Sequence, residues 1–221
     1  MQEQRTFSGI THVVWDWNGT LLDDVSASVA AMNRMLARRN MAALQVDRYR
    51  DIFEFPVRRY YDALGFDFSR EDWDALAREY HDEYEACAMA SPLRAGTVDI
   101  LHACRAAGLG MSVLSASELS ILNRMMAERG VLELFQSVCG LSNLHAVSKL
   151  ELGRKLLAET GVPAREVLFV GDTVHDYEVA QELHCPCLLL AGGHQSRRRL
   201  AACGAVVAEN AAAVLEWRGA V

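Results

Sequence analysis

The first hydrophobic segment of the chain is short and rich in residues that favour strands. It runs from Ile10 to Trp15, and the pair Asn18-Gly19 follows it closely. A short apolar run that is closed by a turn dipeptide is typical of a buried strand. We therefore expect a buried strand here, followed by a tight loop.

The hydrophobic pattern changes between residues 22 and 90. Apolar residues recur there mostly three or four positions apart, with charged residues between them. This spacing, close to the helical period of about 3.6 residues, predicts amphipathic helices and no strands. The residues that carry the pattern are Val29, Met32, Met35 and Leu36 in a first run, and Trp73, Leu76, Ala77, Tyr80 and Tyr84 in a second.

Beyond Pro92, helical and strand-like segments alternate to the end of the chain. Such alternation indicates an α/β fold in which helices cover both faces of a parallel sheet. Because the helical segment interrupts it after the first strand, we predict an α/β core of residues 1–21 and 91–221 and an inserted all-α cap of residues 22–90. The expected helices are 97–107, 119–129, 150–160 and 177–183, and the expected strands are 110–114, 138–139, 167–170, 187–190 and 205–207, before a C-terminal helix.

Composition excludes two classes of partner. The 221 residues carry a formal net charge of −7, and the arginine run 197–199 reads as a solvated helix face. Since nucleic-acid-binding proteins usually present a basic stripe, we expect no nucleic-acid partner. We also expect no membrane contact, because no apolar run approaches the roughly 18 residues of a membrane helix. The polar start shows no signal peptide.

The cysteines point to a reducing compartment. The six cysteines include no Cys-x-x-Cys pair, and most lie in apolar surroundings. Buried free thiols are usual in cytoplasmic proteins. Cys185-Pro-Cys187 is either a metal or redox pair or the start of a buried strand, and its setting favours the strand. We predict a cytoplasmic protein, monomeric or homodimeric.

Polar residues follow several of the predicted strands directly. Asp16 follows the first strand and Ser115 the second; Asp172 and Asp176 follow a later strand, and Lys149 opens the helix before it. Ligands of an open parallel sheet bind at the carboxyl ends of its strands. Three acids, one hydroxyl and one ammonium should therefore converge at one edge. Taken singly, each has a plainer explanation, such as a turn cap, a helix N-terminus or a surface lysine.

Together these residues resemble the four motifs of the haloacid dehalogenase (HAD) superfamily, over almost the whole chain. In the phosphoglycolate-phosphatase-like branch the first motif is Asp-x-Asp-Gly-Thr, and residues 16–20 read Asp-Trp-Asn-Gly-Thr. A helical cap directly after this motif is a further likeness. The resemblance implies a Rossmann-like core and a magnesium-dependent phosphatase that acts on a small phosphorylated metabolite.

The resemblance also implies catalytic roles. Asp16 would be the nucleophile, whose carboxylate attacks phosphorus to form an aspartyl-phosphate. Ser115 would bind a phosphoryl oxygen. Lys149 would screen the repulsion between carboxylate and phosphate as a compact point charge. Lys149 and Lys155 are the only lysines among 22 basic residues. Because lysine is so rare in this chain, its presence at position 149 argues against coincidence.

A Mg²⁺ ion is the implied cofactor, because magnesium prefers hard oxygen ligands. By resemblance, Asp16 and Asp172 would bind it directly and the backbone carbonyl of Asn18 would be a third ligand. Asp176 would bind the ion or orient its waters.

Four residues are expected on the substrate side. Gly19 and Thr20 complete the first motif, and Ala116 stands where many relatives have an asparagine, so one substrate contact should be missing. Arg58, or its neighbour Arg59, is a candidate to bind a substrate carboxylate, the alternative being a surface pair at a helix start.

Asn18 departs from the pattern of the resembling family. Phosphatases of this branch carry an aspartate there, which protonates the leaving group and then activates water. An asparagine amide cannot carry a proton, and loss of a general acid–base typically costs about 10²–10⁴-fold in rate. The chain could act on good leaving groups such as acyl phosphates, use another group such as His175 or a cap residue, or bind a phosphorylated ligand with little turnover. We expect weak but retained phosphatase activity.

Two other functions stay open at this point. Carbon–phosphorus and carbon–halogen hydrolases of the superfamily also lack an acid at position 18. The cap has no lysine for the Schiff base of the former, and halide displacement needs no magnesium although both metal acids are present. A non-catalytic phosphate-binding protein would keep the same pocket.

Overall fold

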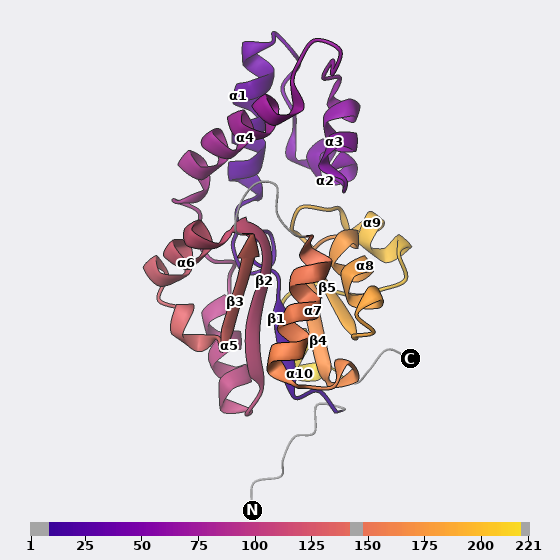
Figure 1. The fold of residues 1–221 in the computed structure, drawn as a ribbon. Helices are drawn as coiled ribbons and strands as arrows, with labels where there is room; N and C mark the ends of the chain where they lie inside the picture. The colour runs from indigo at the N-terminus through magenta and orange to yellow at the C-terminus, as the bar shows by residue number, and fades with distance from the viewer. Residues whose placement is uncertain (1–8, 142–147, 218–221) are drawn as a thin grey trace, which may run out of the picture.

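The structure is a computed structural model that describes residues 9–141 and 148–217 (Figure 1). Six parallel strands form one sheet in the order β3-β2-β1-β4-β5-β6. Each of the six strands expected from the sequence is present. Their bounds are β1 (His12–Trp15), β2 (Gly110–Glu118), β3 (Ser137–Leu141), β4 (Val167–Gly171), β5 (Cys187–Leu190) and β6 (Val206–Ala208).

Helices cover both faces of this sheet, which confirms the predicted α/β fold class. Successive side chains of a strand point to opposite faces. Val13 accordingly packs with one buried cluster and its neighbour Val14 with another. The first cluster takes in residues of α5 (Thr97–Ala106), α6 (Leu119–Glu128) and α10 (Ala213–Glu216), and the second takes in residues of α7 (Lys149–Thr160), α8 (Val174–Glu182) and α9 (Arg197–Ala202).

Four further helices follow β1 and lie beyond the carboxyl ends of the strands (Figure 1). They are α1 (Val25–Arg38), α2 (Val46–Ile52), α3 (Val57–Leu64) and α4 (Trp73–Ala88). Their apolar residues, such as Met32, Tyr60 and Leu76, form a buried cluster of their own. We call α1–α4 the cap; the domain boundaries at residues 21/22 and 90/91 stay a prediction.

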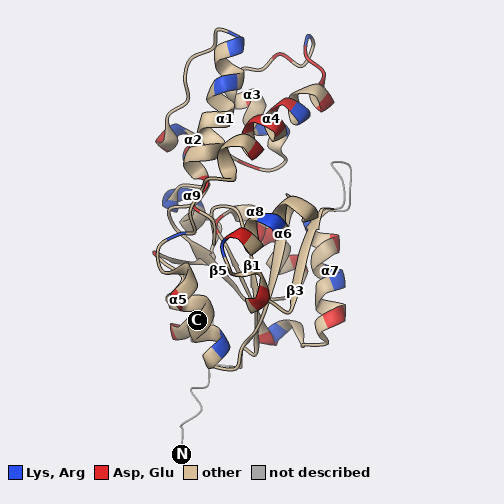
Figure 2. Cartoon of the chain, turned by 90° about the vertical axis from the view of Figure 1, so that its left-hand side faces the viewer, with Lys and Arg blue, Asp and Glu red and all other residues tan. Residues whose placement is uncertain are grey.

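Ion pairs join the two longest helices of the cap. Arg38, the last residue of α1, and Arg39, which follows it, pair with Glu79 of α4 at 2.8 and 2.7 Å. Figure 2 shows basic residues on α1 and mostly acidic ones on α4. Pairs this open to water contribute about 0–1 kcal/mol each. They align α1 with α4, while the buried cluster supplies most of the stability.

The cap contacts the core through α2 and the loop after β5. The guanidinium of Arg50 donates to the backbone carbonyls of Gly192 and Gly193, at 2.7 and 2.9 Å. Arg199 of α9 donates to the carbonyl of Phe53 at 2.9 Å. The arginine run at 197–199 is therefore more than the solvated helix face that the sequence suggested, because Arg198 pairs with Asp51 of α2 and Arg199 also binds the cap.

Two sequence-based expectations find their outcome in the core. Cys185 and Cys187 are buried free thiols, and Cys187 is the first residue of β5, which confirms the interpretation as a strand start. Within the described residues, none of the helices has the length and apolar character needed to cross a bilayer.

Candidate active site

The loop after β1 places Asp16 at the carboxyl edge of the sheet. The backbone of Asp16 still donates to Val170 of β4, at 2.8 Å, so its position is fixed by the sheet. The chain then turns tightly, with Gly19 at a left-handed φ of 71°. A Cβ on Gly19 would lie 2.3 Å from Asp172 Oδ2. Glycine is required there because the backbone passes directly against that carboxylate.

Lys149 bridges two of the predicted acids. Its Nζ donates to Asp16 Oδ1 at 2.5 Å and to Asp176 Oδ1 at 2.6 Å, and its side chain is only 8% exposed. Lys149 is the first residue of α7, and Ser148 caps that helix by accepting from the backbone of Glu151. The helix start thus fixes the ammonium between the two carboxylates.

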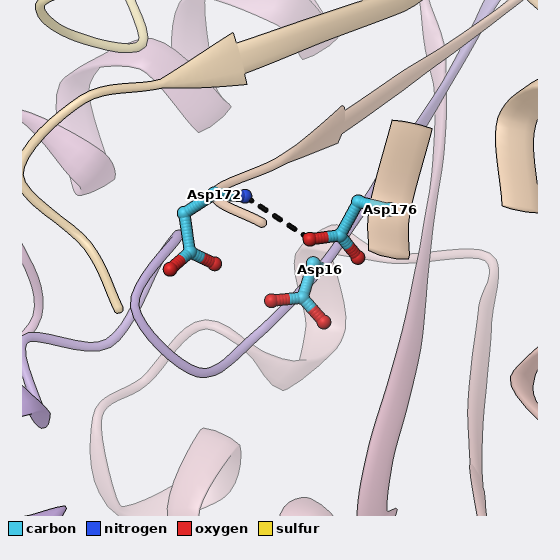
Figure 3. A group of neighbouring side chains, drawn as sticks. All are labelled: Asp16, Asp172 and Asp176. Carbon is cyan, nitrogen blue, oxygen red and sulfur yellow. Dashed lines mark hydrogen bonds between the residues drawn. The ribbon is translucent and has the colours of Figure 1, made fainter. Parts of the chain in front are cut away.

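The third acid, Asp172, completes a group of carboxylates around Asp16. One oxygen from each of Asp16, Asp172 and Asp176 lies within 4.8 Å of the others (Figure 3). Burial raises the pKa of Asp16 to about 8, with the neighbouring charges of Asp176 and Asp172 adding to the effect and Lys149 opposing it. Burial raises the pKa of Asp172 as well. A single ammonium does not neutralise this much buried negative charge.

This group could hold a metal ion. Its ligand atoms are all carboxylate oxygens, the donors that hard divalent cations such as magnesium prefer. A cation here would supply the positive charge that Lys149 alone does not. The hydroxyl of Thr20 lies 3.2 Å from Asp16 Oδ2 and 2.9 Å from Asp172 Oδ1, so it orients both carboxylates.

Asp176 is more firmly committed to the protein than the other two acids. Its Oδ2 accepts from the backbone of Asp172 and from both the backbone and the hydroxyl of Thr173, at 3.2, 2.9 and 2.7 Å (Figure 3). Burial alone would raise the pKa of Asp176, but Lys149 and Thr173 outweigh it and lower the pKa. Its remaining oxygen binds Lys149. Asp16 and Asp172 are therefore the freer ligands.

Asn18 lies at the centre of a second hydrogen-bonded group. Its Nδ2 donates to Asp24 Oδ2 at 3.1 Å and to the hydroxyl of Tyr84 at 2.5 Å. Its Oδ1 accepts from the hydroxyls of Ser115 and Ser117, at 3.3 and 2.7 Å. All the hydrogen-bonding capacity of an amide is thus in use. The predicted phosphate contact of Ser115 competes with this bond to Asn18.

Asp24 and His194 belong to the site although the sequence did not suggest them. Asp24 is fully buried, accepts from the backbone of Gly19 at 2.7 Å and lies 3.3 Å from His194 Nε2. The other ring nitrogen of His194 is 2.7 Å from the hydroxyl of Tyr49, and its backbone donates to Asp172 at 2.6 Å.

This pair is electrostatically balanced. Burial would raise the pKa of Asp24, yet His194, Tyr84 and Asn18 together lower it. Burial would lower the pKa of His194, but Asp24 and then Asp172 and Asp16 raise it to about 9. At neutral pH an imidazolium therefore faces a carboxylate. The position of His194 just after β5 was a usable signal, because the same carboxyl-edge rule identified the residues after β1, β2 and β4.

A cavity of about 450 Å³ opens between these two groups and the cap. At its core end it is lined by Asp16, Asn18, Ala116, Lys149, Asp172, Asp176 and His194, and the cap supplies the opposite wall. The structure thus brings most of the predicted site residues together, with Ser115, Gly19 and Thr20 bonded directly behind the lining.

The predictions for Arg58 and His175 have different outcomes. The structure does not bring Arg58 to the cavity: its guanidinium lies 4.5 Å from the ring centre of Phe68, in a separate surface hollow. His175 does line the cavity and stacks on Phe55, with 4.6 Å between ring centres. The stacking explains its place without requiring that it carry a proton.

Proteins with a similar sequence include two kinds of phosphatase. The chain is 27% identical to N-acetylmuramic acid 6-phosphate phosphatase of Pseudomonas aeruginosa over 174 residues, which cover 77% of this chain and 76% of that protein. It is 23% identical to phosphoglycolate phosphatase of Synechococcus elongatus over 192 residues, covering 86% and 88% of the two chains.

Solved structures share the fold. A putative phosphoglycolate phosphatase from Lactobacillus delbrueckii superposes with a TM-score of 0.79 at 17% identity, covering 96% of this chain and all of the other. The family model described as haloacid dehalogenase-like hydrolase matches residues 13–190. That span includes β1 to β5 and the acids at their carboxyl ends, so the family expected from the motifs is confirmed: the chain belongs to the haloacid dehalogenase-like hydrolases.

Proposed function

We propose that this protein is a magnesium-dependent phosphatase that hydrolyses a small phosphorylated metabolite through an aspartyl-phosphate on Asp16. The observation that carries the proposal is the setting of Asp16, a buried carboxylate between Lys149 and Asp172 at the end of a cavity. The names of the relatives, all phosphatases, agree with it.

The covalent steps follow from this setting. A carboxylate oxygen of Asp16 forms a bond to phosphorus while the bond from phosphorus to the leaving oxygen breaks, and the leaving group departs with the electron pair. Water then attacks phosphorus, the bond to Asp16 breaks, and inorganic phosphate is released. Lys149, at 2.5 Å from Asp16, reduces the repulsion that an anionic substrate meets.

Mg²⁺ fits the residues present, because Asp16 and Asp172 offer carboxylate oxygens within one ion's reach and Asp176 supports them. When bound, it supplies the positive charge that offsets the phosphoryl oxygens. The backbone carbonyl of Asn18 remains the third proposed ligand, and the raised pKa of Asp16 shows why a cation helps to keep that carboxylate ionised.

Activity should be weak toward poor leaving groups. The amide of Asn18 carries no transferable proton, and its four hydrogen bonds hold it in place rather than leaving it free to respond to a substrate. Acyl phosphates need little protonation of the leaving group, so we expect them to be cleaved faster than alkyl esters.

Phosphate release from acetyl phosphate and 4-nitrophenyl phosphate, with Mg²⁺ and with a chelator, tests the proposal. We expect metal-dependent turnover, faster for the acyl phosphate. Asp16→Asn should lower the rate by about 10³-fold or more, since the nucleophile is lost. Asp23→Asn, an exposed acid in the same loop, is the matched control and should leave the rate unchanged. Equal turnover in wild type and Asp16→Asn would refute the nucleophile.

The side-chain amide of Asn18 also favours a second candidate function, the binding of phosphorylated ligands. Because Asn18 is fully hydrogen-bonded, the chain could bind phosphorylated ligands without turning them over. Magnesium-dependent binding of phosphate, seen by calorimetry, together with no release from acetyl phosphate would establish this binding function in place of hydrolysis.

We also propose a cytoplasmic location, in keeping with six free cysteines. The oligomeric state, monomer or homodimer, stays a prediction that light scattering can decide.

A further inference from the structure

The cap wall of the cavity is built from aromatic rings. Phe53, Phe55, Tyr60, Tyr80 and Tyr84 all line it. The rings support one another: Phe53 lies 5.5 Å from Phe55 and 5.4 Å from Tyr60, edge to face. Tyr80 and Tyr84 are stacked, with 5.8 Å between centres and 14° between planes. A wall of mutually packed rings offers flat apolar surface to a ligand.

The cavity offers little to a second anionic group. Lys149 is already bonded to two acids, and the imidazolium of His194 is paired with Asp24. Besides these two, Arg78 is the one lysine or arginine in the part of the lining that the structure describes. Arg78 is exposed, and the cap contributes Asp74, Asp82 and Glu85 to the same lining. Arg58, the candidate for binding a substrate carboxylate, lies elsewhere.

The acids also do not make this a site for cations. Asp74 and Asp82 are exposed to solvent, where salt and water screen their attraction, and Arg78 on the same helix opposes it. Glu85 is already paired with Arg124. The rings are the less exposed part of the wall. Contact with them therefore outweighs the charges at the rim.

From this arrangement we infer that the preferred substrates are phosphate monoesters whose leaving group carries an aromatic ring and no second negative charge. The phosphoryl group would face Asp16 and Lys149, and the ring would lie against Phe53 and Phe55. The cavity of about 450 Å³ is within the range of roughly 300–1,000 Å³ usual for small-molecule sites. This inference rests on the proposed phosphatase function.

Three alkyl phosphates separate the chemistries, because each has a primary alkoxide as its leaving group. Benzyl phosphate carries an uncharged ring, 2-phosphoglycolate a carboxylate, and phosphocholine a cation. With the full chain and Mg²⁺, we expect kcat/KM for benzyl phosphate to exceed the other two by about tenfold or more, since burying one ring is worth at least that factor. Preference for phosphoglycolate or for phosphocholine would overturn the inference.

If alkyl esters react too slowly to compare, competitive inhibition tests the same preference. Benzylphosphonate and phosphonoacetate cannot be hydrolysed and can compete with acetyl phosphate. We expect benzylphosphonate to inhibit about tenfold more strongly, the same ring contact being at stake. Turnover of acetyl phosphate with the opposite order of inhibitors would overturn the inference and leave the proposed phosphatase intact. Absence of turnover with every substrate would refute both.

Two variants of cap residues test whether the aromatic wall selects the ligand. Phe55→Ala should abolish most of the preference for benzylphosphonate while leaving inhibition by phosphonoacetate unchanged. Phe68→Ala is the control, because Phe68 is an aromatic cap residue that lines the separate hollow with Arg58. An unchanged preference in Phe55→Ala, or an equal loss in Phe68→Ala, would show that the rings of the cavity do not select the ligand.

Discussion

Two buried acidic groups lie side by side at the carboxyl edge of the sheet, and they differ in how their charge is balanced. Around Asp16, three carboxylates share the ammonium of Lys149, and the pKa of Asp16 is raised to about 8. Around Asn18, the carboxylate of Asp24 faces His194, and the pKa of Asp24 is lowered. We call the second group complete, because the charge of Asp24 is balanced by a side chain of the protein, and the first group incomplete. The first has an excess of negative charge, which is why we propose it as the site of a cation and a substrate.

Removing Lys149 should have the largest effect, because it takes the one cation from the incomplete group. Lys149→Ala leaves the buried carboxylate of Asp176 without its cation, so we expect about 3–5 kcal/mol of lost stability in metal-free protein. Activity toward acetyl phosphate should fall by about 10³-fold, since removing one such stabilising group typically costs 10²–10³.

Lys155→Ala supplies the control for this substitution. Lys155 is the only other lysine and is exposed on the same helix. Urea unfolding without metal and phosphate release with Mg²⁺ measure the two effects. A Lys149→Ala variant as stable and active as Lys155→Ala would mean that the carboxylates need no ammonium.

An aspartate at position 18 should unbalance the group that is now complete. Asn18→Asp places a carboxylate where an amide now donates to Asp24 at 3.1 Å, so two acids face each other. We expect about 2–3 kcal/mol of lost stability from the lost donor and the repulsion.

Exchanging the two residues sharpens this second prediction. The double variant Asn18→Asp/Asp24→Asn keeps one carboxylate and one amide in the pair, which removes the repulsion, but His194 loses its carboxylate partner. We therefore expect only part of the lost stability to return. The double variant also places a proton carrier beside Asp16, which should speed alkyl-ester hydrolysis by about 10²-fold. Thermal unfolding and phosphate release are the measurements. If the double variant is no more stable than Asn18→Asp, the pair is not the source of the cost.

The pH dependence of stability should show the smallest of these effects. The folded pKa of His194 is about 9, above its ordinary value of 6.5. Its charge therefore stabilises the fold fully below about pH 6.5, and this contribution is lost as pH rises through about 9.

His194→Gln should remove this part of the pH dependence, since glutamine has no proton to lose. Urea unfolding between pH 6 and 10 is the measurement, without added metal. His102→Gln, which alters an exposed histidine of α5, should keep the wild-type profile. The same slope in wild type and His194→Gln would contradict the assigned ion pair.

The sequence was sufficient to predict the sheet and the grouping of Asp16, Asp172 and Lys149 at its edge. Buried strands such as residues 10–15 and 167–170 are specified by local runs of apolar residues, and the carboxyl-edge rule then brings Asp16, Asp172 and Lys149 together without knowledge of any side-chain contact. These inferences depend on topology alone, and topology follows from the alternation of helices and strands.

The carboxyl-edge rule could have pointed to His194, which follows β5, but not to its pairing with Asp24. Asp24 and His194 are far apart in sequence, and neither lies in a motif, so only the packing of the cap on the loop after β5 pairs them. For Asn18, the sequence showed the missing proton but not the four partners of the amide. Arg58 failed to reach the cavity because local sequence does not say which way a short cap helix turns its charged face.

The contact between α2 and the loop after β5 links the entrance of the cavity to its interior. Arg50 binds the carbonyls of Gly192 and Gly193, and Tyr49 binds His194 on the same loop. An outward swing of α2 must break these bonds, and it thereby removes a partner from the imidazolium beside Asp24. A ligand whose release requires that swing should therefore dissociate at a rate that depends on His194 as well as on the cap.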